Sequence, residues 1–586
     1  MSEVDVKKID DEEIAEVEEG MEKDAPSSSE DDLKKETEPL TEEEEEGEVP
    51  PIEKFRQLFV KALTYGFGVL LIVFLLAAFI IDFERAKALF VITCLVVAYN
   101  LYAWYERNNE ESFLAAEDRL ITFLEKTDTD LRYGLGLAST MILIMVVIMA
   151  ATVRDGRNLI SLFGLLVFIG VTWLGSWQPS KVAWRPVLGA LFIQFIFGYV
   201  VIRTEWGFNA IEFLSDIFTT LLGYTIAGSS FVFGWLTDGS LFGRNVALEN
   251  EEGGYNMGPP FFFNVLPSVV FFSSLMSVGY YIGALPWLVR KLGYFLSIVL
   301  GTSASESLSA AGNIFVGQTE APLLVKPFFS TMTDSELHAI MTGGFATIAG
   351  AVYGIYISFG VDATALLAAS VMSAPAALAL SKLACPETED SPTSIRKKGA
   401  FDIPTTGGGA NVVDAAAQGA VIGTQLMLNI AGNLIAFLAI IEMLDQLFQY
   451  CGDRVDMDLS FNRICEIIFF PFAWLMGVDG EDCDEVAILI GLKVIANEFV
   501  AYEALSFNPE IGGAISARSR YIATYALCGF SNLGSIGIQL GGLTPLAPEK
   551  GPTLAKYVVS ALIAGNTACF MTACIAGIFY EEGGLA

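Results

Sequence analysis

The stretch GTSASESLSAAGNIFVGQTEAPLLVKPFFST, residues 301–331, is moderately apolar but interrupted by polar groups in its middle. A second stretch, GVDGEDCDEVAILIGLKVIANEFVAYEALSF at 477–507, has the same character. Both are too polar for helices that face lipid, and non-helical backbone is tolerated at membrane depth only where protein or a water-filled cavity surrounds it. We therefore predict two re-entrant hairpins, with bends near Asn313–Glu320 and Asn497–Glu498.

The remainder of the chain consists largely of apolar runs of about 20 residues, each long enough to cross a bilayer as a helix. Hydrophobic residues make up 53% of the 586 residues, and strand-like alternation, which would suggest a barrel, does not occur. We predict an all-α polytopic membrane protein with about 11 transmembrane helices. Their ranges are 60–81, 87–106, 134–153, 158–176, 185–203, 262–285, 336–360, 364–384, 413–447, 517–545 and 554–579.

Two further segments, 107–132 and 209–230, are amphipathic and are predicted to lie at the membrane surface. Residues 1–52 carry 22 acidic and 5 basic side chains. Their summed charge of −17 is half of the net charge of −34 of the whole chain. This segment has no aromatic residue and cannot bury enough apolar surface to fold, so we predict a disordered acidic tail. It would act either as a regulatory or trafficking arm or simply as a solvated tail.

Lysine and arginine in short loops set the expected orientation, because cytoplasmic loops are enriched in both. The pattern predicts a cytoplasmic amino terminus, and the odd number of spans then leaves the carboxyl terminus outside. The residues that carry this argument are Lys54, Arg56, Lys61, Lys181, Arg185, Arg290, Lys291, Arg396, Lys397, Lys398 and Lys550.

The two hairpin regions also resemble each other. Each carries a glutamate, Glu320 or Glu498, and each is followed by a span with a glycine-rich polar middle, GGFATIAGAVYG at 343–354 or CGFSNLGSIGIQ at 528–539. Three spans separate the hairpins, and an odd number makes the two copies inverted across the membrane. Inverted repeats with broken helices are typical of secondary transporters, with the substrate site at the repeat interface.

The polar groups in these segments form a candidate binding site. Ionisable residues inside a membrane cost roughly 2.5–3.5 kcal/mol on insertion scales, so they suggest function by default. Carboxylates accept from hydroxyls and amides both donate and accept, which suits an uncharged, hydroxyl-bearing solute such as a sugar-bearing molecule. The alternative is that these groups only pair across helices. The set is Gln318, Thr319, Glu320, Glu498, Asn532 and Ser535, with Phe530 packing on the flat part of the solute.

A cation site is the second hypothesis. Sodium prefers oxygen ligands, and broken helices expose carbonyls, so Asn313 with the carbonyls of Val316, Thr347 and Ile348 is a candidate cage. Enzymatic chemistry has little support, because His338 is the only histidine and the eight cysteines show no metal-ligand spacing. We predict neither an enzyme nor a cofactor other than a coupling ion.

Several of these motifs, taken in order, resemble the concentrative nucleoside transporter family. The resemblance covers about 180–580, and the additional spans before it make the chain similar to the animal members. The motifs are WRPVLGALFIQF (184–195), GSSFVFG (228–234), GNIFVGQTEAPLL (312–324), ELHAIMTGGFATIAGAVYGIYISFG (336–360), SVMSAPAALALSKL (370–383), NEFVAYE (497–503) and IATYALCGFSNLGSIGIQLGGL (522–543).

The resemblance implies sodium-driven symport of nucleosides into the cell across the plasma membrane, by a homotrimer with an elevator mechanism and without a nucleic-acid partner. Glycine at Gly317 resembles members that accept purines. The runner-up is a proton-coupled nucleoside symporter with the same site. The implied nucleoside contacts are Gln318, Thr319, Glu320, Val352, Glu498, Phe530, Asn532 and Ser535, and the implied sodium ligands are Asn313, Val316, Thr347 and Ile348.

The expected organisation follows the chain. It runs through the cytoplasmic tail (1–52), amino-terminal transmembrane helices (53–180), scaffold helices with an interfacial helix (181–290), the first transport repeat (291–384), a cytoplasmic loop (385–412), a long scaffold helix (413–450), the second transport repeat (451–580) and a short extracellular tail (581–586).

Overall fold

The computed structural model describes residues 69–81, 131–153, 155–237, 260–394, 409–457 and 459–584, together with a few isolated positions. The predicted tail 1–52, the predicted span 87–106 and the segment 107–132 lie almost entirely outside the described residues. The chain divides into two units, Met1–Phe113 and Leu114–Ala586. The described part of the first unit is mainly one apolar helix, Val69–Ile81, which falls within the span predicted at 60–81.

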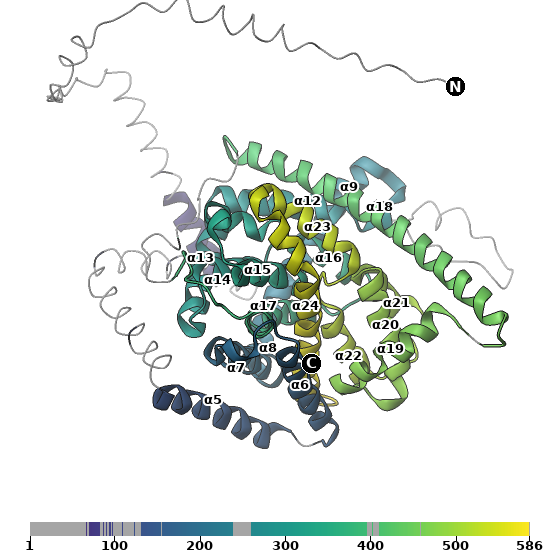
Figure 1. Ribbon diagram of the computed structural model, residues 1–586. Coiled ribbons are helices and arrows are strands. Elements are labelled where there is room, and N and C mark those ends of the chain that lie inside the picture. The colour runs from purple at the N-terminus through teal and green to yellow at the C-terminus, as the bar shows by residue number, and fades with distance from the viewer. Residues whose placement is uncertain are drawn as a thin grey trace, which may run out of the picture. The chain divides into compact units, whose positions relative to one another are not determined.

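In the second unit, every regular element among the described residues is a helix (Figure 1). Four predicted spans, those that begin at 134, 158, 185 and 262, coincide with α5, α6, α7 and α11–α12. The elements before the first hairpin are α5 (Leu131–Thr152), α6 (Arg157–Leu174), η1 (Pro179–Lys181), α7 (Trp184–Arg203), α8 (Glu205–Gly223), α9 (Thr225–Phe233), η2 (Gly234–Leu236), α11 (Phe261–Asn264) and α12 (Pro267–Tyr281).

Among the described residues, nine helices are long and apolar enough to cross a membrane. One of them joins α8, α9 and η2 over Glu205–Leu236, whereas the sequence led us to place 209–230 at the surface. The apolar residues that follow position 224 extend the run beyond the amphipathic part. The chain is therefore an all-helical protein with several membrane-spanning helices.

The same succession of elements occurs twice, in the order short helix, hairpin, broken helix, long helix. The first copy is α13 (Ala284–Leu300), α14 (Ala304–Gly312), η3 (Ala321–Thr331), α15 (Asp334–Ala346), η4 (Gly350–Val352), α16 (Tyr353–Ser358) and α17 (Ala363–Ala384). The second is α19 (Phe461–Met476), η5 (Gly480–Asp482), α20 (Cys483–Ile495), α21 (Glu498–Phe507), α22 (Ala517–Leu527), α23 (Leu533–Leu543), η6 (Thr544–Leu546), η7 (Pro548–Lys550) and α24 (Gly551–Phe579).

The helices α13 and α19 were not among the predicted spans. They have 17 and 16 residues, which is short for a simple crossing of the bilayer. Arg290 and Lys291, which we assigned to a loop, lie inside α13. Their use as loop charges in the orientation argument was therefore wrong.

Local chemistry explains why the hairpins bend. Pro322 and Pro327 lie in η3, and because proline lacks an N–H this arm forms 3-10 turns instead of an α-helix. In the second hairpin, α20 ends before Ala496, and Asn497 is extended and caps α21 through its side chain. Both helix breaks lie at the residues where we predicted bends, and the re-entrance of these segments into the membrane stays a prediction.

Buried charged side chains form polar contacts at the ends of the two hairpins opposite their bends. Lys382 in α17 forms an ion pair with Glu306 in α14, and both side chains are almost fully buried. Arg518 in α22 donates to the carbonyls of Gly477 and Gly577 at 3.1 and 3.2 Å. The first hairpin is therefore anchored at its base by α17, and the start of the second is tied through Arg518 to α22 and α24.

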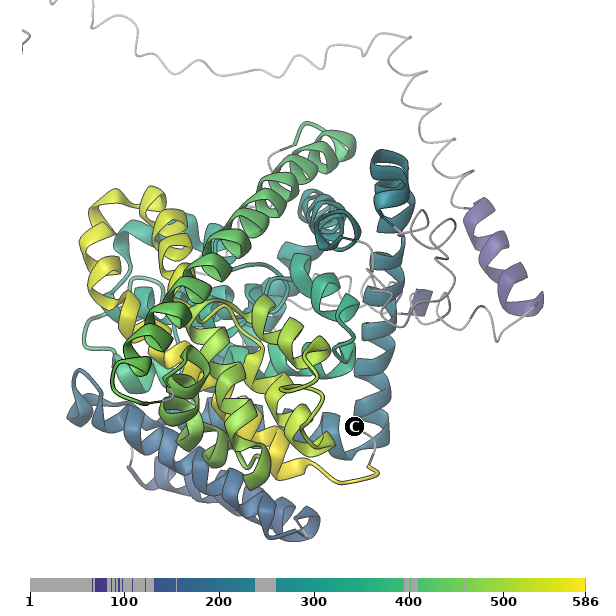
Figure 2. The same ribbon diagram turned by 90° about the vertical axis from the view of Figure 1, so that its right-hand side faces the viewer.

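Burial separates the helices of the second unit into two groups. In the most apolar stretch of each of three segments, most residues are buried. The buried share is 94% for α15 with α16, 89% for α17 and 78% for α24. The helix α18 (Val412–Asp453) has 42 residues, and only 11% of the residues in its most apolar stretch are buried. Figures 1 and 2 show α18 extending along one side of this unit. Its apolar surface is therefore available for lipid or for other subunits.

Candidate functional site

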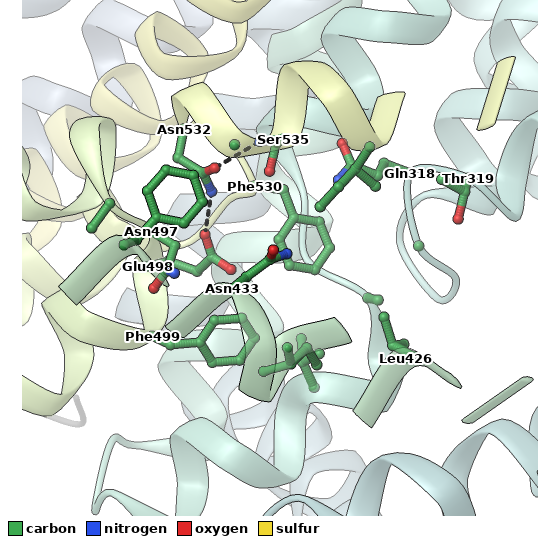
Figure 3. A pocket seen from close by; sticks show the side chains of 18 of the residues that line it. Gln318, Thr319, Leu426, Asn433, Asn497, Glu498, Phe499, Phe530, Asn532 and Ser535 are labelled. Carbon is green, nitrogen blue, oxygen red and sulfur yellow. Dashed lines mark hydrogen bonds between the residues drawn. The ribbon is translucent and has the colours of Figure 1, made fainter. Parts of the chain in front are cut away.

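A pocket lies where both hairpins, both broken helices and α18 meet (Figure 3). It contains Gly317 and the eight residues that we predicted to contact a solute. The lining residues are Gly317, Gln318, Thr319, Glu320, Ala349, Val352, Leu426, Ile430, Asn433, Phe437, Ala496, Asn497, Glu498, Phe499, Phe530, Asn532, Gly534, Ser535 and Ile538. The structure thus gathers the predicted positions in one place, and their role in binding stays a prediction.

Glu498 is the first residue of α21 and is 1% exposed. Its Oε2 accepts a hydrogen bond from Asn532 Nδ2 at 2.9 Å, and its Oε1 accepts one from the Tyr356 hydroxyl at 3.3 Å. The positive end of the helix dipole also favours a carboxylate at this position. Glu498 is therefore held in one orientation from two sides.

Asn532 links Glu498 at the start of α21 to the start of α23. Its Oδ1 accepts from the Ser535 backbone N–H at 2.8 Å and caps α23, while its Nδ2 donates to Glu498. Because both ends of the amide are used, the amide orientation is fixed by these contacts. Figure 3 shows this chain of hydrogen bonds beside the ring of Phe530.

The bend of the first hairpin forms the opposite part of the pocket. The Gly317 N–H donates to Glu320 Oε2 at 3.1 Å. Gln318 is 6% exposed and its Oε1 has no hydrogen-bond partner among the described residues. A Cβ on Gly317 would lie 3.2 Å from the Cβ of Ala349, so the bend packs closely against the first helix break.

The sequence argument missed the wall contributed by α18. Leu426, Ile430, Asn433 and Phe437 follow helical spacing and line the pocket on one face of that helix. Phe437 approaches α23 because Gly534 has no side chain; a Cβ there would be 3.0 Å from the ring. The available signal was Asn433, an amide in the middle of a long apolar helix. Asn497 and Phe499, beside Glu498, were also missed.

The predicted cation ligands come from two segments that contact each other. The Gly350 N–H donates to the Phe315 carbonyl at 3.2 Å, which joins the first bend to the first helix break. Asn313 is fully buried, and neither polar atom of its side chain has a hydrogen-bond partner among the described residues. Such orphaned groups are rare in folded proteins. An amide oxygen left free in this way fits a cation ligand.

Thr347 extends this region. Its hydroxyl donates to the Gly343 carbonyl at 2.8 Å, and a Cβ on Gly343 would lie 2.9 Å from Asn313 Nδ2. Its own carbonyl accepts from the Phe530 N–H at 3.2 Å. That single backbone bond connects the first helix break, beside the candidate cation ligands, with the second break, beside the pocket.

The histidine does not belong to the pocket. His338 is buried in α15, where its ring nitrogens pair with the hydroxyls of Ser381 and Ser560 at 2.7 and 3.1 Å. Within the described ranges, no group of three or more His, Cys, Asp or Glu side chains is arranged to hold a metal ion.

Three family profiles match most of the second unit. The profile described as Na+ dependent nucleoside transporter N-terminus matches residues 163–236, and the nucleoside recognition profile matches 262–363. The profile described as Na+ dependent nucleoside transporter C-terminus matches 365–577. The three matches follow one another along the chain and include every element that lines the pocket.

Full-length relatives are similar over most of the chain. Sodium/nucleoside cotransporter 2 of Mus musculus is 42% identical over 546 residues, which are 90% of this chain and 78% of the relative. Solute carrier family 28 member 3 of Homo sapiens is 44% identical over 87% of this chain and 73% of the relative. The solved structure of CNTnw in an inward-facing substrate-bound state has a TM-score of 0.66 and 39% identity, covering 72% of this chain and 98% of that one.

Proposed function

The chain belongs to the sodium-dependent nucleoside transporter family, and we propose that it carries nucleosides into the cell together with sodium. The observation that supports this proposal most directly is the buried pair of Glu498 and Asn532, which faces Gln318 across one pocket. Its relatives are named as sodium/nucleoside cotransporters. The chain itself is a membrane protein with several spanning helices.

The pocket chemistry suits the two parts of a nucleoside. Glu498 accepts hydrogen bonds and therefore pairs with the hydroxyls of the sugar, beside Asn532 and Ser535. Gln318 both donates and accepts, which suits the edge of a base. Phe530 and Val352 supply apolar surface for the flat face of the base. Thr319 and Glu320 complete the base end of the pocket.

Sodium binds, in this proposal, to Asn313 and to the carbonyls of Val316, Thr347 and Ile348. The ion would hold the first hairpin bend against the first helix break, and this would order the segment that ends at Gln318. An inward electrical potential of 100 mV adds roughly 2.3 kcal/mol of driving force for each sodium that enters. One coupled ion is then sufficient to accumulate solute.

We further propose that the transport unit moves as an elevator. The two repeats, 291–384 and 451–580, are inverted across the membrane and carry re-entrant hairpins. The long helix α18 belongs to the stationary scaffold. We propose a homotrimer, in which part of the apolar surface that α18 leaves unburied packs against other copies and the rest faces lipid. The protein would lie in the plasma membrane with its amino terminus in the cytoplasm and its carboxyl terminus outside.

Uptake measurements test the function. Cells that express the chain should take up radiolabelled adenosine and uridine in a saturable manner, and replacing external sodium by choline should abolish uptake. Uptake that survives in choline at acidic pH would favour the proton-coupled alternative with the same site. No uptake of either nucleoside, with the protein present at the cell surface, would reject the proposed substrate class.

Replacing Asn313 by leucine should weaken sodium dependence. The change removes a ligand oxygen but keeps a similar volume, and disturbing ligand shells typically lowers metal affinity roughly 10–100-fold. We expect the half-saturating sodium concentration for uptake to rise by at least about tenfold. Ser309→Ala is the matched control, because it removes another buried polar group one turn earlier. Unchanged sodium dependence in Asn313→Leu would remove Asn313 from the cation site.

Replacing Gly317 by serine should shift selectivity toward pyrimidine nucleosides. A new Cβ would lie 3.2 Å from Ala349 and 3.8 Å from Glu320 Oε2, so the base end of the pocket becomes narrower. We expect the adenosine-to-uridine ratio of kcat/KM to fall about tenfold, within the range for a small change in pocket size. Gly537→Ser, at a site with no atom within 4 Å, is the control. An unchanged ratio would reject the size argument.

A further inference from the structure

Gln539 is a buried polar side chain that neither lines the pocket nor belongs to the proposed sodium ligands. It lies on α23 one turn after Ser535 and is 0% exposed. Neither its Oε1 nor its Nε2 has a hydrogen-bond partner among the described residues. Gln318 has an Oε1 in the same condition. Two buried amides in this state are unusual in a folded protein and require an explanation.

The amide of Gln539 and the Cβ of Gln318 approach the same point of α15. A Cβ on Gly344 would lie 2.8 Å from Gln539 Oε1 and 2.9 Å from the Cβ of Gln318. On the next turn of α23, a Cβ on Gly542 would lie 2.6 Å from Thr319 Cγ2. The first hairpin bend therefore rests on α23 between positions 539 and 542. Gln318 lines the pocket, whereas Gln539 does not line it and approaches Gly344 beside the Cβ of Gln318.

We propose that Gln539 is a positioning residue that lets Gln318 recognise bases with opposite hydrogen-bonding edges. The inference rests on the proposed nucleoside transport. An amide turned by 180° exchanges its donor and its acceptor. A second amide behind it pairs with either orientation, donating to Oε1 in one and accepting from the NH2 group in the other. Gln318 therefore remains supported in both orientations.

Recognition of all the natural bases requires both orientations of the Gln318 amide. The amino group of adenine or cytosine donates a hydrogen bond, whereas the keto group of hypoxanthine or uracil accepts one. Gln318 presents its oxygen to the former and its NH2 group to the latter. Because the amide of Gln539 supports each case, the site accepts amino and keto bases alike. This property is distinct from base size, which Gly317 controls.

Two substitutions at position 539 test the support of Gln318 in different ways: one favours a single orientation of its amide, and the other removes the support for both orientations. In Gln539→Glu, burial favours the neutral carboxyl, so uptake is measured at alkaline pH, where the ionised side chain only accepts hydrogen bonds. It then holds the NH2 group of Gln318 and leaves the oxygen toward the base. Uptake should then favour amino bases, with the adenosine-to-inosine and cytidine-to-uridine ratios of kcat/KM rising about tenfold. In Gln539→Met, which has a similar volume and no amide, kcat/KM should fall severalfold for all four nucleosides.

The experiment measures uptake of the four radiolabelled nucleosides by the full chain and by both variants, normalised to protein at the cell surface. The half-saturating sodium concentration, measured in parallel, should not change. Unchanged selectivity ratios in Gln539→Glu and unchanged kcat/KM in Gln539→Met would overturn the inference and leave the proposed function intact. A change confined to sodium dependence would also overturn it, since Gln539 would then belong to the cation site. Absence of uptake by the unmodified chain would reject both proposals.

Discussion

Replacing Glu498 by glutamine is expected to lower kcat/KM for nucleoside uptake about a hundredfold while the protein still reaches the membrane. Both carboxylate oxygens accept hydrogen bonds, from Asn532 and from Tyr356. A glutamine places an NH2 group against one of these donors, and it also removes the charge that we propose receives the sugar hydroxyls. A hydrogen bond to a charged group contributes about 1.5–3 kcal/mol, and roughly 2.7 kcal/mol corresponds to a hundredfold change.

The matched control for this variant lies on the same helix. Glu503 is exposed and does not line the pocket, so Glu503→Gln should leave the uptake kinetics within about twofold. The measurement is initial uptake of labelled nucleoside over a range of concentrations, corrected for surface protein. Wild-type kinetics in Glu498→Gln would remove Glu498 from the substrate site.

Replacing Gly529 by alanine should abolish uptake by disturbing the point where the two broken helices cross. Gly529 has a φ of +155°, and a Cβ there would lie 2.6 Å from Cys569 Sγ and 3.0 Å from the Phe345 carbonyl oxygen. Backbone strain and overpacking each cost roughly 1–3 kcal/mol. We therefore expect a lower melting temperature in detergent as well as the loss of transport.

A glycine in the next helix provides the control for that variant. Gly537 lies in α23 and has no atom within 4 Å of an added Cβ. Because alanine is also the better helix former, Gly537→Ala should preserve both uptake and melting temperature. The melting temperature follows from size-exclusion chromatography of heated, solubilised protein. Normal stability and normal uptake in Gly529→Ala would contradict the tight crossing.

The polar chemistry of the chain was visible in the sequence. We could predict bends near Asn313–Glu320 and Asn497–Glu498 because glutamates and amides interrupt otherwise apolar stretches. Their assembly into one pocket followed from the internal repeat. The family resemblance was correct, and three of its motifs, 312–324, 497–503 and 522–543, include these polar groups.

The apolar elements were harder to predict. Leu426 and Ile430 line the pocket from α18, but apolar residues do not show which face of a helix meets lipid and which meets protein, and only Asn433 marked the pocket face. The short helix α13 was missed because Arg290 and Lys291 look like loop charges, although long cationic side chains can extend from a helix to a polar surface. The neighbours of Gln539 depend on Gly344, which only the packed structure brings beside it.

The hydrogen bond from the Phe530 N–H to the Thr347 carbonyl joins main chain to main chain. No side chain takes part, so most substitutions at either residue leave the bond in place. If sodium binding affects nucleoside binding through this bond, most amino-acid substitutions at these two positions leave that coupling unchanged. In the proposed function, the choice of base depends instead on side chains such as Gln318 and on the glycine before it. Evolution can then change what such a transporter carries without losing the ion that drives it.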